Sequence, residues 1–377
     1  MYLFVIVLLY NDRAKYNTLK KEKHMKRLIK STILLILAAS MLTACSGIAQ
    51  KNEPVEKPAA GEESKEPEKK EEEKELTKIR ISDLRSEFWL PAYVAQQLGY
   101  YEEEGLEAEF VTFKDGPVAF QSMHAGEIDF CMLSTEPVLI GYDNGLKSKI
   151  LFTVLKNKPF MLISNSEITE ISQLKGTKIA AGTPGSGPYA FITSILKKNG
   201  IDPLKEVELI NMDYNATLVA LENNQIQATF FDSTRKNDEA IKNANVLVDT
   251  TDEATHKEIY GSTLYESSVV TTTEKIASEE PEKVQKFTNA IAKAFKWQNE
   301  HTDEEIAELI APLFEGTDMT AIIPVTRSSL SKDGIISEEG YKTIVDFCIE
   351  EDIIKNDIPF ENIIDNSFIE KSWKEIN

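Results

Sequence analysis

The chain has 377 residues, with 62 acidic and 42 basic side chains and a formal net charge of −20 at pH 7. Removal of an N-terminal leader (residues 1–44, described next) takes away eight Lys/Arg and two Asp/Glu and leaves −26. This charge excludes a nucleic-acid-binding protein, because such proteins present basic stripes to the phosphate backbone. About 300 residues then remain, enough for one large domain or two medium ones.

The leader is typical of a bacterial secretory signal. From Met25, "MKRLIKSTILLILAASMLTACSG" has a basic start and an apolar run at 33–42 that is too short to span a bilayer as a stable helix. The closing "LTAC" resembles the lipoprotein processing box, in which the cysteine thiol is lipidated. We therefore expect lipidation of Cys45. A buried core cysteine is the alternative, but no globular sequence surrounds this position.

Two flanking stretches are expected to lie outside the fold. "MYLFVIVLLY" is too short to span a membrane, and we expect translation to begin at Met25, with a genuine N-terminal extension as the alternative. Residues 45–76 contain few large apolar side chains and many Glu, Lys and Pro, so they bury too little surface to offset chain entropy. We expect a disordered tether, the alternative being a charged interaction tail.

From Thr77 onward, short apolar runs alternate with helical patterns, which predicts an α/β fold. The expected strands are 78–84, 106–113, 127–133, 150–165, 177–181, 206–212, 225–233, 245–251 and 264–276. The expected helices are 91–100, 116–126, 186–200, 215–224, 281–301, 302–314 and 338–354. Pro91 near the start of the first helix and Gly200 at the end of the third are typical helix boundary residues.

Two expected strands end in similar polar residues. "GEIDFCMLSTE" (126–136) and "NQIQATFFDST" (224–234) each follow an amphipathic helix, and each strand gives way to hydroxyl and acidic side chains at the same point. Ligands of open α/β sheets gather at the carboxyl ends of strands. The echo favours two similar lobes that face one cleft, while a chance likeness of two βα units is the alternative.

The segment "GTPGSGPYAF" (182–191) follows an expected strand and opens a helix. Gly185 and Gly187 permit a tight turn, Ser186 is a plausible N-cap, and free N–H groups at a helix start bind acceptor atoms. The segment matches neither the Walker loop nor the dinucleotide-binding pattern. By itself it is as typical of a capped helix as of a binding site.

The sequence contains no recognisable catalytic set. Its four histidines have no metal-ligand spacing, and there is no GxSxG motif; the histidines are His24, His124, His256 and His301. Cys131 and Cys348 lie in apolar runs, so we expect two separate buried thiols rather than a disulfide. We therefore expect a protein that captures a molecule without converting it, and that needs no cofactor and no metal.

Five segments are similar, in order and spacing, to the solute-binding proteins of ABC importers for nitrate, sulfonates, taurine and thiamine precursors. They are "QQLGYYEEEGLEAEFV", "SMHAGEIDFCML", "ISQLKGTKIAAGTPGSG", "LKKNGIDPLKEVEL" and "SEEPEKVQKFTNAIAKAFKW". Each is weakly specific alone, whereas five in order are specific. A lipid anchor agrees with Gram-positive members, which have no periplasm to hold a soluble receptor.

The resemblance implies a two-lobe α/β fold of the periplasmic-binding-protein type (type II), with a ligand cleft between lobes joined by two crossing segments. Lobe one would comprise Thr77–Ser164 and Val269–Asn377, and lobe two Asn165–Ser268. The crossings would lie near 160–166 and 265–270. Hinge closure would then couple ligand binding to recognition by the permease.

Carried over onto this sequence, the first ligand loop of the family falls on Arg85–Trp89. Phe88 and Trp89 are then expected to line the cleft, with Trp89 tucked behind Pro91 as the alternative. The expected ligand-binding residues of lobe one are Arg85, Glu87, Phe88, Trp89, Gly116, Ser134, Thr135 and Glu136. Those of lobe two are Thr183, Gly185, Ser186, Gly187, Tyr214 and Asp232.

The sequence is compatible with two classes of ligand. A sulfonate or nitrate needs hydrogen-bond donors and a cation, which the 185–187 loop and Arg85 offer. Three of the expected cleft residues are acidic and three are aromatic, which suits a flat nitrogen heterocycle or a small amine. "LSTEPVL" also looks more like the pyrimidine-binding branch of the family. We favour a thiamine-precursor-like pyrimidine or related heterocycle or amine, with sulfonate, taurine or nitrate as the alternative.

The resulting hypothesis is a monomeric lipoprotein on the outer face of the cell membrane that delivers a small molecule to an ABC permease and its ATPase. One alternative is an enzyme like the pyrimidine synthases that share the fold, with Glu136 as general base. No cysteine- or histidine-rich motif of those enzymes is present. A surface adhesion or sensor module is the other alternative.

Overall fold

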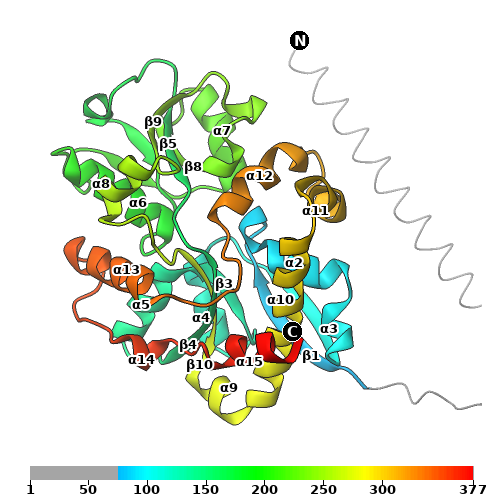
Figure 1. Ribbon diagram of the computed structural model, residues 1–377. Coiled ribbons are helices and arrows are strands. Elements are labelled where there is room, and N and C mark those ends of the chain that lie inside the picture. The colour runs from blue at the N-terminus through cyan, green and yellow to red at the C-terminus, as the bar shows by residue number, and fades with distance from the viewer. Residues whose placement is uncertain (1–74, 377) are drawn as a thin grey trace, which may run out of the picture. The chain divides into compact units, whose positions relative to one another are not determined.

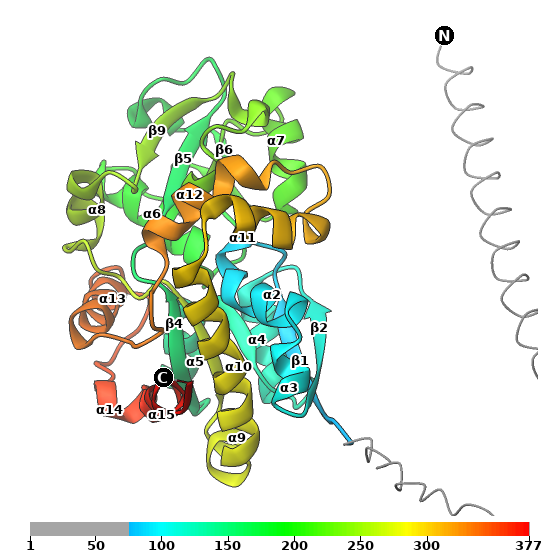
Figure 2. The same cartoon turned by 45° about the vertical axis from the view of Figure 1, so that its right-hand side comes forward.

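The computed structural model describes residues 75–376, apart from the side chains of Tyr214, Asn215 and Ala240 (Figures 1 and 2). The predicted signal, the lipidation site Cys45 and most of the predicted tether lie outside the described residues. Within residues 75–376, none of the helices combines the length and the apolar character that crossing a membrane requires.

The first sheet has the strand order β2-β1-β3-β10-β4 in the described residues. A parallel bridge between Ile81 and Phe130 joins the parallel pair β1–β2 to the antiparallel set β3–β10–β4. These strands are β1 (Thr77–Asp83), β2 (Leu106–Thr112), β3 (Cys131–Ser134), β4 (Ser148–Leu155) and β10 (Ser268–Thr273). The final strand thus returns to the sheet from a position more than 100 residues later in the chain.

The second sheet has the order β7-β6-β8-β5-β9. Its strands are β5 (Phe160–Ser164), β6 (Lys178–Ala180), β7 (Glu208–Ile210), β8 (Ala228–Asp232) and β9 (Asn245–Asp249). β8 lies parallel to β6 and antiparallel to β5, as β3 lies parallel to β1 and antiparallel to β10. β3 and β8, which carry the two similar sequence segments, therefore occupy matching places, which favours two related lobes over a chance likeness.

The helices surround these two sheets (Figure 1). Those within the first 260 residues are α2 (Leu90–Gln97), α3 (Tyr100–Glu103), α4 (Gly116–His124), α5 (Thr135–Asp143), α6 (Gly187–Lys198), α7 (Tyr214–Glu222) and α8 (Glu253–Tyr260). The later ones are α9 (Glu274–Glu279), α10 (Pro281–Glu300), α11 (Asp303–Ile310), α12 (Met319–Ser329), α13 (Glu338–Glu350), α14 (Phe360–Ile363) and α15 (Ser367–Ile376). Short 3₁₀ turns include η1 (Glu87–Trp89), η2 (Ile171–Leu174), η3 (Ser233–Arg235), η4 (Glu239–Ile241) and η5 (Ala311–Leu313).

Most strands and helices lie close to their predicted positions. The expected helix 91–100 is divided into α2 and α3 because Gly99 between them adopts a φ of +73°, which glycine does readily. The sequence analysis does not assign α5, which follows β3 without a loop, nor α8, α9, α12, α14 and α15; the first residues of α9 lie in the expected strand 264–276. Cys131 and Cys348 are buried free thiols, as predicted, and burial raises the pKa of both.

We call the first sheet with its helices the first lobe, and the second sheet with α6, α7 and α8 the second lobe. The chain crosses from β4 to β5 through residues 156–159 and returns through 261–267. Phe160–Ser164, which the sequence assigns to lobe one, pairs with β8 and β9 and belongs to the second sheet. That boundary is wrong because 150–165 reads as one apolar run, whereas its strand partners divide it at Pro159.

His256 at α8 fixes the first crossing segment. Its Nε2 accepts a hydrogen bond from the backbone N–H of Lys158 (3.2 Å), and its Nδ1 lies 2.6 Å from the carbonyl oxygen of Ser262 in the second crossing. These contacts require a neutral ring that carries its proton on Nδ1. Burial lowers the pKa of His256.

An aromatic stack forms the centre of the first lobe. The Phe287 ring of α10 lies 3.9 Å from the ring of Phe130 in β3, nearly parallel to it, and 6.1 Å from the ring of Tyr101 in α3. All three side chains are completely buried. The long helix α10 is thereby fixed against the sheet and against α3.

We expect Phe287→Ala to lower the free energy of unfolding by about 3–5 kcal/mol, because it leaves a cavity within this stack. Urea denaturation measures the change. Val219→Ala, at a side chain on α7 that is 58% exposed, is the matched control and should change stability by less than about 0.5 kcal/mol. Equal effects of the two substitutions would contradict the role given to the stack.

We also expect stability to fall as the pH falls from about 7.5 to about 5.5. In the unfolded chain the imidazole has a pKa of about 6.5, whereas in the folded protein the pKa of His256 is lower. As the pH falls, the unfolded state therefore binds the proton first, and acid favours unfolding. His256→Gln should remove part of this pH dependence. His301→Gln is the control, since this ring lies at the end of α10, outside the crossings, with its Nδ1 2.7 Å from the carbonyl oxygen of Trp297. An unchanged pH slope in His256→Gln would refute the assignment.

Candidate functional site

The expected ligand residues of the two lobes meet along one boundary. In the first lobe they come from the loop after β1 and from the starts of α4 and α5, and in the second from the start of α6 and the end of β8. The hydrogen bonds that cross it include Thr183 Oγ1 to Asp115 Oδ2 (2.6 Å), Gly187 N–H to Ser134 Oγ (3.2 Å) and Thr234 Oγ1 to Glu87 Oε1 (2.5 Å). The lobes therefore face one another in contact, as in a closed clamshell.

Two helix starts face each other at the middle of this boundary. Ser186 caps α6 by accepting a hydrogen bond from the Tyr189 N–H. Ser134 occupies the N-cap position of α5 but makes no side-chain cap there; its hydroxyl instead accepts the Gly187 N–H of the other lobe. Free N–H groups and the helix dipole make such a place suitable for an anion.

Glycines allow the lobes to approach this closely. A methyl group on Gly187 would lie 2.8 Å from Ser134 Oγ and 3.1 Å from Glu136 Oε2, and one on Gly185 would lie 3.2 Å from Ile140 Cδ1. Gly185 also adopts a φ of +86°, which side-chain-bearing residues rarely adopt. The predicted glycine loop therefore serves the contact between lobes as well as the turn.

A buried ion pair lies behind this contact. Lys158 of the first crossing is 1% exposed and its Nζ donates to Glu136 Oε1 at the start of α5, which is completely buried. The Tyr265 hydroxyl of the second crossing donates to the same oxygen at 2.9 Å. Burial, and next the Glu136 charge, raises the pKa of Tyr265, so the phenol keeps the proton that it donates. Glu136 Oε2 has no hydrogen-bond partner among the described residues.

The two aromatic residues of the first loop have different places. The Phe88 ring faces the second lobe, with its centre 6.3 Å from that of Phe160, which in turn contacts Phe191 and Phe230. Trp89 is 3% exposed and packs into the core of the first lobe, and its Nε1 has no partner among the described residues. The expectation that Trp89 lines the cleft is therefore wrong. The 3₁₀ turn η1 directs adjacent side chains to different sides, which a sequence does not reveal.

For the remaining expected residues near the boundary, the structure gives local contacts or burial. Arg85 has a φ of +55°, and its exposed side chain places Nε 3.1 Å from Asp83 Oδ2. Thr135 Oγ1 donates to the carbonyl oxygen of Glu266. Asp232 ends β8 and is 7% exposed. Gly116 is buried at the start of α4 and Tyr214 begins α7, but the side chain of Tyr214 is not among those described.

Lys158, Phe160 and Tyr265 are the boundary residues that the sequence analysis does not identify. Lys158 precedes Pro159 between two apolar runs, and a lysine in such a place is the one signal that the sequence offers. In residues 75–376 no three His, Cys, Asp or Glu side chains are grouped as metal ligands would be.

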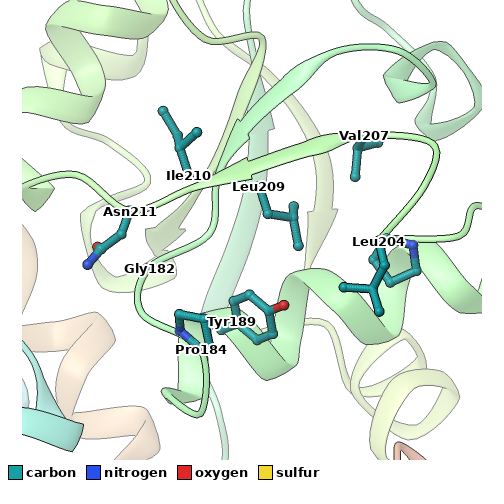
Figure 3. A pocket seen from close by; sticks show the side chains of 9 residues that line it. Gly182, Pro184, Tyr189, Leu204, Val207, Leu209, Ile210 and Asn211 are labelled. Atoms are coloured by element: carbon teal, nitrogen blue, oxygen red, sulfur yellow. The ribbon is translucent and has the colours of Figure 1, made fainter.

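Two hollows adjoin the boundary. One, of about 420 Å³, lies between α5 of the first lobe and α6 of the second and reaches Glu136 and Gly185. The other, of about 260 Å³, lies beside the start of α6 within the second lobe and is mostly apolar (Figure 3).

Comparison with known proteins agrees with this architecture. A Bacillus subtilis (strain 168) protein named "Putative aliphatic sulfonates-binding protein" is 28% identical over 315 residues, which cover 80% of this chain and 90% of that one. A solved structure of a Bordetella bronchiseptica RB50 protein has a TM-score of 0.69 at 22% identity and covers 80% of this chain and 98% of its own.

A second solved structure is the alkanesulfonate-binding protein SsuA of Xanthomonas axonopodis pv. citri bound to MOPS, with a TM-score of 0.60 at 16% identity, covering 77% of this chain and 98% of that one. At this identity the likeness shows the fold alone, which is the two-lobe periplasmic-binding-protein fold. The family model described as "NMT1/THI5 like" matches residues 88–305, more than half of the chain. The chain therefore belongs to the NMT1/THI5-like family.

Proposed function

We propose that this protein is the solute-binding component of an ABC importer and that its ligand is a sulfonate. The relative of 28% identity is named for binding aliphatic sulfonates and shares nearly its whole length with this chain. The two-lobe fold, with hydrogen bonds that cross between the lobes, supports capture by closure around a small molecule.

The meeting of two helix starts at Ser134 and Gly187 is the observation that carries the sulfonate assignment. α5 and α6 direct their N-terminal ends toward the same point from opposite lobes. A sulfonate there accepts N–H hydrogen bonds from both helices and lies at the positive end of both dipoles. Binding then stabilises the closed arrangement, because each lobe supplies only half of the donors.

A pyrimidine or amine ligand is the second candidate. The buried Glu87 carboxylate and the facing rings of Phe88 and Phe160 favour it, since an acid and two rings suit a flat donor-bearing molecule. The burial of Trp89 in the first lobe weakens this candidate, because one of the three expected stacking rings is absent from the boundary.

The proposed transport role also assigns a membrane anchor and protein partners. A lipid on Cys45 anchors the protein to the outer face of a Gram-positive membrane, and the acidic segment 45–76 serves as the tether. The partners are a permease and its ATPase, and the protein acts as a monomer. Enzymatic activity is not part of this role, and recovery of the bound compound unchanged after incubation would support that.

We expect propanesulfonate to raise the melting temperature, and propanesulfonamide, its neutral analogue, to have little effect. At about 100 times its Kd, a ligand adds about 2.7 kcal/mol of stability, a shift that thermal denaturation resolves readily. Stabilisation by an aminopyrimidine and by no sulfonate would overturn the ligand assignment alone. No response to sulfonates, taurine, nitrate, pyrimidines or amines would overturn the receptor assignment.

We expect Gly187→Ala to weaken sulfonate binding at least about tenfold, since the added methyl group would lie 2.8 Å from Ser134 Oγ when the lobes are closed. The backbone tolerates alanine at this helix start, so the unliganded melting temperature should change little. Isothermal titration calorimetry measures the affinity, with Ser278→Ala on the exposed face of α9 as control. Unchanged affinity in Gly187→Ala would exclude this boundary as the ligand site.

A further inference from the structure

The hollow of about 420 Å³ between α5 and α6 is large enough for a small organic molecule. Its first-lobe wall comes from α5 and from the loop after α13, and its second-lobe wall comes from α6 and from residues 202–204. We call it the α5–α6 pocket. A molecule bound there touches both lobes.

The α5–α6 pocket is largely separate from the boundary proposed to hold the sulfonate. Of the expected ligand residues, only Glu136 and Gly185 line it, whereas Phe88, Ser134 and Gly187 do not. The two sites adjoin at Glu136, because a methyl group on Gly187 would lie 3.1 Å from its Oε2. The rest of the pocket lining is separate from the boundary.

The inner end of the pocket holds an acceptor without a partner. Glu136 lines the pocket and is completely buried; its Oε1 receives Lys158 and Tyr265, while Oε2 makes no hydrogen bond to the described residues. A buried carboxylate oxygen left unpaired is costly, so this atom favours a ligand that brings a hydrogen-bond donor.

The charged residues around the pocket favour a cationic donor. Its lining contains four acids and one base: Glu136, Asp202, Glu351, Asp352 and Lys197. Lys197 is engaged by Glu351, with Nζ 3.1 Å from Oε2 and a hydrogen bond to the backbone carbonyl. Asp202 Oδ2 receives Lys205 Nζ at 2.8 Å. With Lys158 paired to Glu136, these three ion pairs leave Asp352 as the lining acid without a lysine partner among the described residues, so the pocket keeps a net negative charge of about one.

The outer part of the pocket is apolar and continues into the second hollow. Tyr189, Pro203 and Leu204 line both hollows, and Figure 3 shows Tyr189 of α6 and Leu204 directed toward the space beneath Leu209. Leu204 is 79% exposed, a large apolar side chain left in contact with water. These side chains offer a surface on which an alkyl or aromatic body packs.

We propose that the α5–α6 pocket binds a small organic ammonium ion, with the ammonium group donating to Glu136 Oε2 and the hydrocarbon part packed against Tyr189, Pro203 and Leu204. The ion links the two lobes, because Glu136 belongs to the first and the apolar residues to the second. The site selects a primary amine with a short alkyl or aryl group over its neutral counterpart.

The test uses the full chain, with 2-phenylethylammonium as the probe and 2-phenylethanol as its neutral analogue. Calorimetry and NMR titration measure binding. We expect the ammonium ion to bind and the alcohol to bind at least about tenfold more weakly, because the alcohol can still donate one hydrogen bond to the carboxylate but lacks the positive charge.

Two variants at one exposed position control for folding. Leu204→Lys should bind the ammonium ion at least about fivefold more weakly than Leu204→Glu, because both substitutions remove the same apolar contact and they differ in the sign of the added charge. Added salt should reduce this difference. Glu136→Gln should weaken binding further, and the Leu204 pair keeps the test decisive if that variant does not fold.

Equal affinity for the ammonium ion and the alcohol would overturn the proposal, as would an identical response of Leu204→Lys and Leu204→Glu. Absence of any binding by 2-phenylethylammonium and by butylammonium would also overturn it. Failure of sulfonate binding is a separate result, because it is measured with sulfonates and with Gly187→Ala, whereas these outcomes are measured with ammonium ions and with the Leu204 pair.

Discussion

The buried pair of Glu136 and Lys158 is the interaction on which the arrangement of the lobes depends. It joins the start of α5 to the first crossing segment, and Tyr265 adds the second crossing to the same carboxylate oxygen. Two charges removed from water require each other, because either one alone is costly in a protein interior. Both connections between the lobes are therefore fixed to one point of the first lobe.

The close approach of the lobes follows from small side chains at the facing surface. At Gly185 and Gly187 the backbone of α6 comes within contact distance of α5, where any larger residue would collide with Ser134 or Ile140. This proximity lets two helix starts share one anion, and it also encloses the α5–α6 pocket from both sides. One physical constraint thus supports both the proposed transport site and the proposed ammonium site.

The candidate site was only partly accessible from the sequence. The polar ends of β3 and β8 and the glycine loop were recognisable because chain direction brings strand ends and helix starts to one edge of a sheet. The Phe88 ring faces Phe160 of the second lobe, whereas Trp89 does not, since one step of a 3₁₀ turn moves a side chain from the boundary into the core. Lys158 was missed because a charged residue between two apolar runs looks like an ordinary exposed loop.

The sequence by itself determined the α/β class, the order of most strands and helices, the buried thiols and the family, because these follow from periodicity, local capping and short motifs. Only the tertiary structure decided that residues 160–164 belong to the second sheet, which side of the boundary each aromatic ring occupies, and that Glu136 binds both crossings. The reason is that strand pairing, burial and ion pairing depend on residues 22 to 129 positions apart, whereas a sequence pattern reports only on near neighbours.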